Sequence, residues 1–497
     1  MQSVGAAWLM VSLGAGPMYI ALTQTASSLP FFLLALPAGS AGDIFDRRKL
    51  ILLTESWMAS VAIVIAVLTI TGHMTPWLLL ALTFALSAGD AFETPTWRAV
   101  LPELVPKDEL ASASALNGIE FNLARAVGPA LAGSLIAAVG IGAAFVANVL
   151  SFMGVIVVIA RWKRPVHKRT APAETLGGAT VAAIRYIRYS PPIRALMVRT
   201  GAGMFFASAL FALLPTIARG ISNSPIDYGL LLGFFGTGAV LGALAMQPLR
   251  NRWSTEVVVS SGIAIMGIVI MALGTMHRLS TLGPVIVIGG GAWILFISLV
   301  SALIQNLAPD WVRARVLAVF ILVSQGSMAF GSAAWGAVAQ RSGIRIALLC
   351  AGFGMIGTTG LALVAKLPDA SADLSPWNHW RVPVVISEVG AELERGPVLV
   401  TVEYVVKPGQ QDEFVEAIHR YERIRRRDGA SRWGIFHDTA AGDRYLEIFL
   451  VDTWAEHLRQ HDRQTQADRH LEQRLSSFVV GEPQVRHLIS AQSKKRR

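Results

Sequence analysis

Five ionisable side chains interrupt the apolar stretches in the first half of this sequence. They are Glu55, Asp90, Glu93, Glu120 and Arg125. A charge is costly in hydrocarbon, so such a residue faces a protein interior, pairs with another or changes protonation state. A guanidinium stabilises one carboxylate while crowding favours the protonated form of its neighbour. Asp90, Glu120 and Arg125 are therefore predicted to form a proton-coupling group that binds and releases a proton. The alternative is a static salt bridge between two helices. Glu55 and Glu93 are expected to be solvated near the membrane boundary.

Polar and aromatic side chains in other apolar stretches predict a path for a large, partly apolar cargo. The polar members are Asn117, Asn122, Gln305, Asn306 and Gln325, and the aromatic ones include Trp293, Phe296 and Phe330. Packing alone is the alternative for the aromatic residues. No Walker A sequence occurs, so ATP-driven transport is not supported and no cofactor is expected. His457 and His461 have a metal-ligand spacing, but a solvated helix face explains them better, so no metal is expected.

The composition indicates a chain whose main solvent is lipid. Of its 497 residues 53% are hydrophobic and only 15% are charged, and the mean hydropathy is +0.51. A soluble protein of this length carries nearer a quarter charged residues. The formal net charge of +10 fits the Lys/Arg excess of cytoplasmic loops, so nucleic acid is not expected as a partner.

Eleven apolar runs are long enough to cross about 30 Å of hydrocarbon. They lie at residues 17–38, 50–71, 77–97, 112–139, 141–160, 195–218, 228–248, 256–276, 281–305, 315–340 and 345–366. Met1 to Ser12 is too short to span and is interpreted as the second half of a first helix whose beginning is missing. Restoring that helix gives two bundles of six helices, at residues 1–160 and 195–366, joined by a basic linker at 161–194.

The distribution of arginine and lysine predicts the orientation. With both ends in the cytoplasm, the inner loops hold most of the basic residues and the outer loops hold only Arg219, Arg278, Arg341 and Arg345. This asymmetry agrees with the positive-inside rule. The similar segments 101–113 and 308–320, which follow the runs 77–97 and 281–305, indicate two related halves with the cargo path between them.

The character of the chain changes after a linker at residues 367–395. Residues 396–490 alternate between short apolar strands and polar helices, and two of the strands carry apolar residues on both faces. The expected strands are 396–406, 432–438, 444–454 and 483–489, and the expected helices are 410–427 and 455–478. The order βαββαβ is that of a ferredoxin-like α+β domain, here placed in the cytoplasm.

Two short motifs in the spans carry a resemblance to known transporters. The segment GSAGDIFDRRKL, with Gly39, Asp43, Arg47 and Arg48, resembles the loop motif of the major facilitator superfamily, although Ile44 and Asp46 depart from it. That resemblance implies a conformational latch, and plain topological anchoring is the alternative for the basic residues. The segment RAVGPALAG, with Gly128, Pro129 and Gly133, resembles the bend of proton-coupled antiporters; a small-residue packing seam is the alternative.

Nearly the whole chain resembles the enterobactin-exporter-related branch of the superfamily, the transmembrane secretion effectors. SLPFFLLALPAG, DAFETPTWRAVLPELVP and TWAEHLRQH are among the segments that carry the likeness. The resemblance implies a multi-pass protein of the bacterial inner membrane that exports siderophores, drugs or other hydrophobic metabolites by proton antiport. An importer is the alternative, since direction depends on coupling.

The last domain resembles the dimeric α+β barrels of the antibiotic-biosynthesis monooxygenase type. This likeness implies a homodimer formed through the sheets of two copies. An active oxygenase-like domain is an alternative that would need a closed pocket around His437 or Tyr445. Fold alone does not establish catalysis, so the chain is expected to be a transporter and not an enzyme.

Overall fold

A computed structural model of the chain describes residues 1–106, 108–162, 176–222, 224–367, 374–375, 377 and 396–490. Within helices, the side chains at 36, 39–44, 98–99, 102–103, 111, 114–115, 118–123, 125–126, 176–180 and 462 are also outside this description. The chain forms two compact units. The first comprises Met1–Pro172, Leu196–Ala302 and Ala318–Asp369, and the second comprises Ala173–Ala195, Leu303–Leu317 and Ala370–Arg497.

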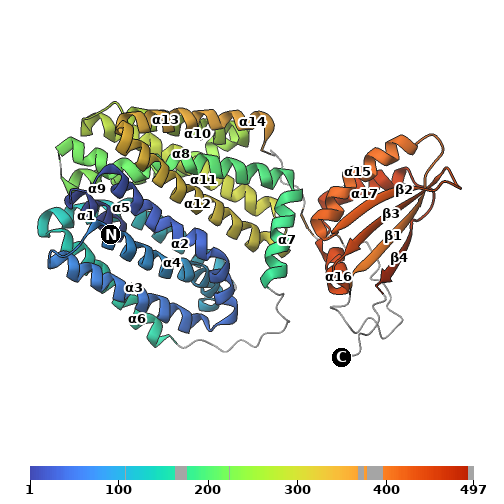
Figure 1. The fold of residues 1–497 in the computed structure, drawn as a ribbon, viewed down its shortest axis with the longest axis horizontal. Coiled ribbons are helices and arrows are strands. Elements are labelled where there is room, and N and C mark those ends of the chain that lie inside the picture. The colour runs from blue at the N-terminus through green and yellow to red at the C-terminus, as the bar shows by residue number, and fades with distance from the viewer. Residues whose placement is uncertain are drawn as a thin grey trace. The chain divides into compact units, whose positions relative to one another are not determined.

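The first unit is built from long helices (Figure 1). The helices of the first half are α1 (Gln2–Ser12), α2 (Pro17–Ile44), α3 (Arg47–Ile70), α4 (Pro76–Leu104), α5 (Leu110–Val139) and α6 (Ile141–Arg161). Those of the second half are α8 (Pro191–Ser222), α9 (Pro225–Arg252), α10 (Thr255–Leu273), α11 (Leu279–Leu307), α12 (Asp310–Ser342), α13 (Ile344–Gly357), the 3-10 turn Thr358–Gly360 and α14 (Leu361–Val364).

Helices cover all eleven predicted spans, and the predicted helical membrane architecture is confirmed. In the part of the chain that the structure describes, nine helices are long and apolar enough to cross a membrane. Helices α4 and α5 are as long but are not among these nine, and α4 contains Asp90 and Glu93. A helix satisfies its backbone N–H and C=O groups internally, which hydrocarbon requires of a spanning segment.

The two halves meet where α5 packs on α9. A Cβ atom at Gly133 would lie 2.9 Å from the carbonyl oxygen of Pro225 and 3.0 Å from Cα of Gly229. Conversely, a Cβ atom at Gly229 would lie 2.9 Å from the carbonyl oxygen of Pro129. The two backbones therefore touch directly, as small residues permit in membrane helix pairs.

A second contact between the halves joins α2 to α12. The hydroxyl of Thr25 donates to the carbonyl oxygen of Ala329 at 3.0 Å. The rings of Phe32 and Phe330 meet edge to face with their centroids 5.6 Å apart. The halves therefore meet at two helix pairs, α5 with α9 and α2 with α12. Each pair contains one helix from each half.

The second unit contains the tail domain, residues 396–490, and helix α7 (Leu176–Tyr189). The tail domain comprises β1 (Val398–Val405), α15 (Gln411–Asp428), β2 (Arg432–His437), β3 (Arg444–Val451), α16 (Trp454–Arg463), α17 (Gln466–Ser477) and β4 (Gln484–Ile489). The strands pair antiparallel in the order β2-β3-β1-β4. Figure 1 shows the sheet with its helices alongside. The order agrees with the predicted ferredoxin-like pattern.

One face of the sheet forms the core of the tail domain. Val398, Val400 and Val402 alternate inward from β1 and pack with Phe414 and Ile418 of α15. The carboxylate of Glu447, although fully buried, accepts hydrogen bonds from Tyr404, Trp433 and Arg425. A buried charge is tolerated when every acceptor position is used in this way.

The expected single helix over 455–478 is wrong, because the structure has two helices there. α16 ends at Arg463 and α17 begins at Gln466. Thr465 forms a capping box with Asp468: its hydroxyl donates to the carboxylate at 2.8 Å, and its backbone N–H donates to it at 3.0 Å. A residue of this type followed three positions later by an acid is an N-terminal signal, and the sequence contained it.

Replacing Gly133 by alanine should force α5 away from α9. We expect the Gly133→Ala protein to lose about 1–3 kcal/mol of stability through overpacking against backbone atoms that cannot yield. Thermal unfolding of the purified protein in detergent measures the loss. Gly128→Ala is the matched control, since a Cβ atom there meets nothing within 4 Å. Equal stability of the two variants would contradict the described contact.

Candidate functional site

A cavity of about 220 Å³ lies inside the first unit, between helices of the two halves. Helices α1, α2 and α5 of the first half line it with Ser3, Val4, Ala6, Ala7, Thr23, Gln24, Ser27 and Pro129. Helices α8, α9 and α11 of the second half contribute Phe211, Tyr228, Leu232, Phe235, Gly236, Ala239, Val240, Trp293 and Ile294. A concave site at the junction of two bundles is a usual place for a small molecule.

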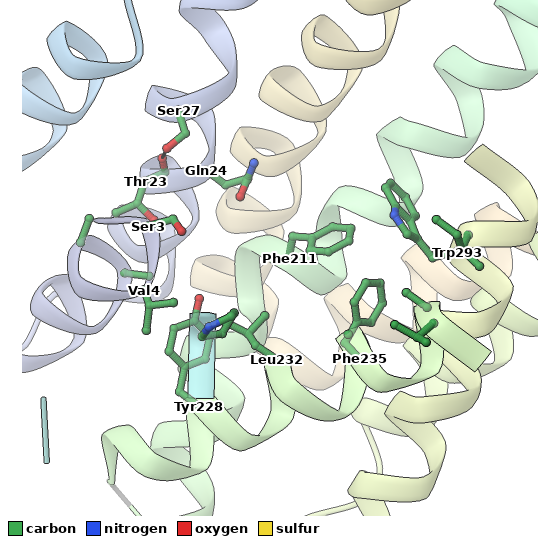
Figure 2. A pocket seen from close by; sticks show the side chains of 17 residues that line it. Ser3, Val4, Thr23, Gln24, Ser27, Phe211, Tyr228, Leu232, Phe235 and Trp293 are labelled. Atoms are coloured by element: carbon green, nitrogen blue, oxygen red, sulfur yellow. Dashed lines mark hydrogen bonds between the residues drawn. The ribbon is translucent and has the colours of Figure 1, made fainter. Parts of the chain in front are cut away.

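The two walls of the cavity differ in chemistry. Figure 2 shows Ser3, Thr23, Gln24 and Ser27 on the side of the first half, and Phe211, Phe235 and Trp293 on the side of the second. The centroid of the Phe211 ring is 5.4 Å from that of Phe235 and 5.0 Å from that of Trp293. One wall therefore offers hydroxyl and amide groups, and the other offers edge-to-face aromatic rings.

The indole of Trp293 provides the aromatic wall with a polar atom. Its side chain is buried, with 5% of the residue exposed. Its N–H has no hydrogen-bond partner among the described residues. An unpaired buried donor is costly, and a ligand that carries an acceptor would satisfy it.

The described residues of the predicted substrate path do not line this cavity. Gln305 and Asn306 are exposed in the last turn of α11, Asn117 is exposed on α5, and Gln325 is half-buried on α12. None of these four lines the cavity, and the side chain of Asn122 lies outside the described residues. The aromatic residue Trp293 does line it. Thr23, Gln24 and Ser27 were missed, although three polar residues within an apolar run were a visible signal.

The predicted proton-coupling group is only partly described. Asp90 is exposed on α4 and accepts a hydrogen bond from the hydroxyl of Thr94 at 3.2 Å. The side chains of Glu120 and Arg125 lie outside the described residues, so their distance from Asp90 remains a prediction.

Glu55 and Glu93 form an acid pair between α3 and α4. Glu55 is 4% exposed, which corrects the expectation that it is solvated. Its carboxyl group lies next to that of Glu93, and both lie within electrostatic range of Asp90. The hydroxyl of Thr54 donates to Glu93, at 3.2 Å. Two carboxyl groups this close repel each other when both are ionised.

An ion pair in the second half was missed. Arg199 lies within the predicted span 195–218 and is 1% exposed, and both oxygens of Glu256 accept from its Nη1 at 2.7 Å. The guanidinium also donates to Ser260, and the backbone N–H of Leu367 donates to Glu256 at 2.9 Å. Ionisable residues in the spans are therefore not confined to the first half. This cluster joins α8, α10 and the segment after α14.

The loop between α2 and α3 positions its arginines at helix ends. The side chains of Gly39 and Asp43 lie outside the described residues, and Arg47 is half-buried in the first turn of α3. Arg48 donates to the carbonyl oxygens of Ile159 and Ala160, at 3.1 and 2.6 Å. Arg48 thus satisfies the open carbonyl groups at the end of α6, as cations at helix C-termini do.

The predicted bend lies at the α5–α9 contact. Pro129 lines the cavity and its carbonyl oxygen faces Gly229, while Gly133 touches Gly229 directly. Gly128 has open space around it. The motif therefore combines a cavity wall with a close helix contact.

The tail domain has a small cavity of about 30 Å³ beside Arg425, His457, His461 and His487. Burial, together with His487 and His461, lowers the pKa of His457 to about 3, so its imidazole is neutral. Neither His437 nor Tyr445 lines this cavity, and its volume is far below that of organic ligand sites. Among the described residues, no group of three or more His, Cys, Asp or Glu side chains is arranged to hold a metal ion.

Comparison with known proteins places this geometry in a family. The family model of the transmembrane secretion effectors matches residues 1–495. The multidrug efflux pump Tap of Mycolicibacterium fortuitum is 23% identical over 70% of this chain and 87% of its own length. The staphyloferrin A transporter of Staphylococcus aureus is 23% identical over 66% of this chain and 83% of its own length. Macrolide efflux protein A of Streptococcus pyogenes is 22% identical over 52% and 65%, respectively.

Solved structures share the fold of this chain. The nucleoside transporter NupG superposes with a TM-score of 0.62 at 10% identity, over 73% of this chain and 94% of its own. A bacterial homologue of the lysosomal transporter Spinster, in an inward-facing conformation, gives 0.55 at 14% identity, over 73% and 92%. The relatives are membrane transporters and not enzymes. The chain is a multi-pass membrane protein that belongs to the transmembrane secretion effector family of major facilitator transporters.

Proposed function

We propose that this protein is a secondary active exporter that moves an amphipathic small molecule by alternating access. The observation that carries the proposal is the cavity between the two halves, with its polar and aromatic walls. A cavity bounded by both bundles opens to alternate sides when one bundle rocks against the other. Its volume of about 220 Å³ is below that of most drug-sized sites, so entry of such a cargo requires the halves to separate.

The proposed cargo class is a siderophore, drug or other hydrophobic metabolite that carries hydrogen-bond acceptors. The rings of Phe211 and Phe235 suit an apolar body, and the free N–H of Trp293 suits an acceptor on it. Relatives named for multidrug, macrolide and staphyloferrin transport support this class. The charge distribution along the sequence supports the inner membrane of a bacterium, with both termini in the cytoplasm.

Proton antiport is the proposed energy source. Asp90, Glu120 and Arg125 remain the proposed coupling group, and Gly39, Asp43, Arg47 and Arg48 the proposed latch. The proximity of Asp90 to the acid pair Glu55–Glu93 supports proton binding in this bundle. The contact of Gly133 with Gly229 supports a tight bend between the halves, which an antiporter needs to prevent proton leakage.

The tail domain is proposed to pair with a second copy through the open face of its sheet. Phe436, Leu446 and Leu488 are 55%, 38% and 52% exposed, and each lies on β2, β3 or β4. Apolar residues of this kind on one sheet face favour burial against a partner.

Shortening Trp293 should weaken cargo binding. We expect Trp293→Ala to raise the cargo concentration for half-maximal efflux about tenfold, because truncating an aromatic anchor in a buried site costs about 1–3 kcal/mol. Uptake of a labelled macrolide by everted membrane vesicles measures the change. Trp253→Ala is the matched control, since Trp253 is 58% exposed at the end of α9. An unchanged response in Trp293→Ala would remove the cavity from the transport path.

Neutralising Glu120 should uncouple efflux from the proton gradient. We expect Glu120→Gln to abolish pH-driven efflux while the cargo still binds, because glutamine cannot carry the proton. Vesicles with an imposed pH gradient and a direct binding assay separate the two steps. Glu109→Gln makes the same chemical change at an exposed residue before α5 and should leave efflux intact. Normal efflux by Glu120→Gln would reduce the group to a structural salt bridge.

Charging the open sheet face should prevent pairing of the tail domain. We expect the isolated 396–490 fragment to be a dimer in light scattering, and Leu446→Arg to make it a monomer, because the charge would be buried at the interface. Leu471→Arg is the control, since Leu471 is 37% exposed but lies on α17. A well-folded wild-type monomer at high micromolar concentration would refute the pairing.

A further inference from the structure

Helix α7 has one face buried and one face open. It belongs to the second unit, together with the tail domain and residues Leu303–Leu317. Its residues Ala182, Ala183 and Tyr186 are 3%, 1% and 3% exposed, whereas Val181 and Ile184 are 59% and 55% exposed. Helix α15 of the tail domain packs against it. This helix, which lies within the basic linker 161–194, is thus partly covered by protein.

We propose that the tail domain is a clamp, which binds α7 and the turn between α11 and α12 of its own chain and so ties together parts of the second half that the sequence separates. The occupant of this surface on the tail domain is therefore an intramolecular one. The docking is independent of the transport proposal; only its consequence for the transport cycle rests on that proposal.

A charged contact fixes α7 to α16. Nη2 of Arg185 lies 2.6 Å from Oε1 of Glu456, and the Arg185 side chain also donates to the backbone carbonyl of Arg427. Burial alone would raise the pKa of Glu456, but hydrogen bonds and charges from Arg463 and Arg185 outweigh burial and hold this pKa below its usual value. The carboxylate is therefore ionised at neutral pH, and the ion pair is present under cellular conditions.

An aromatic contact adds the turn between α11 and α12. The Tyr186 hydroxyl donates to the carbonyl oxygen of Leu307, the last residue of α11, at 3.2 Å. Its ring meets that of Trp311, in the first turn of α12, edge to face at 5.7 Å. The guanidinium of Arg463 in α16 lies 4.5 Å from the centroid of Trp311. One tyrosine and one tryptophan thereby join α7, the turn and the tail domain.

The chain itself transmits this contact to the membrane part. A single residue, Ser190, separates α7 from α8, and α8, α11 and α12 each continue from the second unit into the first. A helix moves as a rigid element, so a displacement of α8 relative to α11 and α12 must shear the contacts of Tyr186 and Trp311. The clamp therefore restrains the cytoplasmic ends of these three helices.

Hydrogen exchange of the full-length protein in detergent, followed by mass spectrometry, tests the clamp. We expect Arg185→Glu to speed exchange about tenfold in residues 181–190, 303–317 and 454–463, because each segment loses protection when the contact opens. Arg188→Glu is the matched control. Arg188 lies on the same helix, is exposed, and contacts its neighbour Tyr189. The control should exchange like the native protein.

Equal exchange of Arg185→Glu and the native protein in all three segments would overturn the clamp. If Arg185→Glu also speeds exchange in α10, the variant is unfolded and a second variant is needed. Trp311→Ala leaves every charge in place, and its exchange in the same three segments is then compared with that of the native protein. Protection in 303–317 that falls on about tenfold dilution would assign the contact to a second copy and overturn the intramolecular assignment. Protection that is independent of concentration and lost in Arg185→Glu or Trp311→Ala supports it.

Discussion

The cost of an unpaired polar atom in hydrocarbon governs the membrane part of this protein. Every spanning segment is helical because only a helix satisfies its own backbone there. The hydrophobic effect does not drive such helices together in lipid, because lipid tails are as apolar as their side chains. They pack where small residues let their backbones approach each other closely. The contact of Gly133 with Gly229 is of that kind. The same cost explains why the buried Arg199 is paired with a carboxylate and a hydroxyl through its two terminal nitrogens, although its Nε has no partner among the described residues.

Two of the buried polar atoms that lack a hydrogen-bond partner among the described residues lie in the regions to which function is assigned above. Trp293 leaves a donor unpaired at the cavity, and Glu55 leaves one carboxyl oxygen without a partner among the described residues. Both atoms are buried, and a buried polar atom without a partner destabilises the fold. A ligand that accepts from Trp293, or a proton bound by Glu55, would remove that destabilisation. In the tail domain, by contrast, the buried carboxylate of Glu447 has all its partners within the fold. Its network specifies a stable core and leaves binding to surfaces elsewhere.

The sequence predicted the architecture well because that architecture follows from local rules. Apolar run length set the spans, and alternation with turn residues set the strands of the tail domain in their observed order. It predicted the cavity poorly, because which faces of α2, α9 and α11 meet depends on contacts between residues far apart in the chain. Gln305 and Asn306 had suitable chemistry but lie at the end of their helix, whereas Thr23 and Gln24 lie at the junction. The prediction that Glu55 is solvated rested on its depth in the span alone. Its burial depends on the neighbouring helix α4, which carries Glu93, and that contact is not visible in the sequence.

The hydrogen bond from Leu367 to Glu256 sets a boundary for any shortened version of this protein. The donor lies three residues beyond the end of α14, in a stretch that reads as the start of a linker. A chain cut at Val364 would keep all its membrane helices and yet deprive Glu256 of a buried backbone partner. A chain cut after Pro368 would keep that partner. The membrane part, as a unit that can be isolated, therefore extends past its last helix.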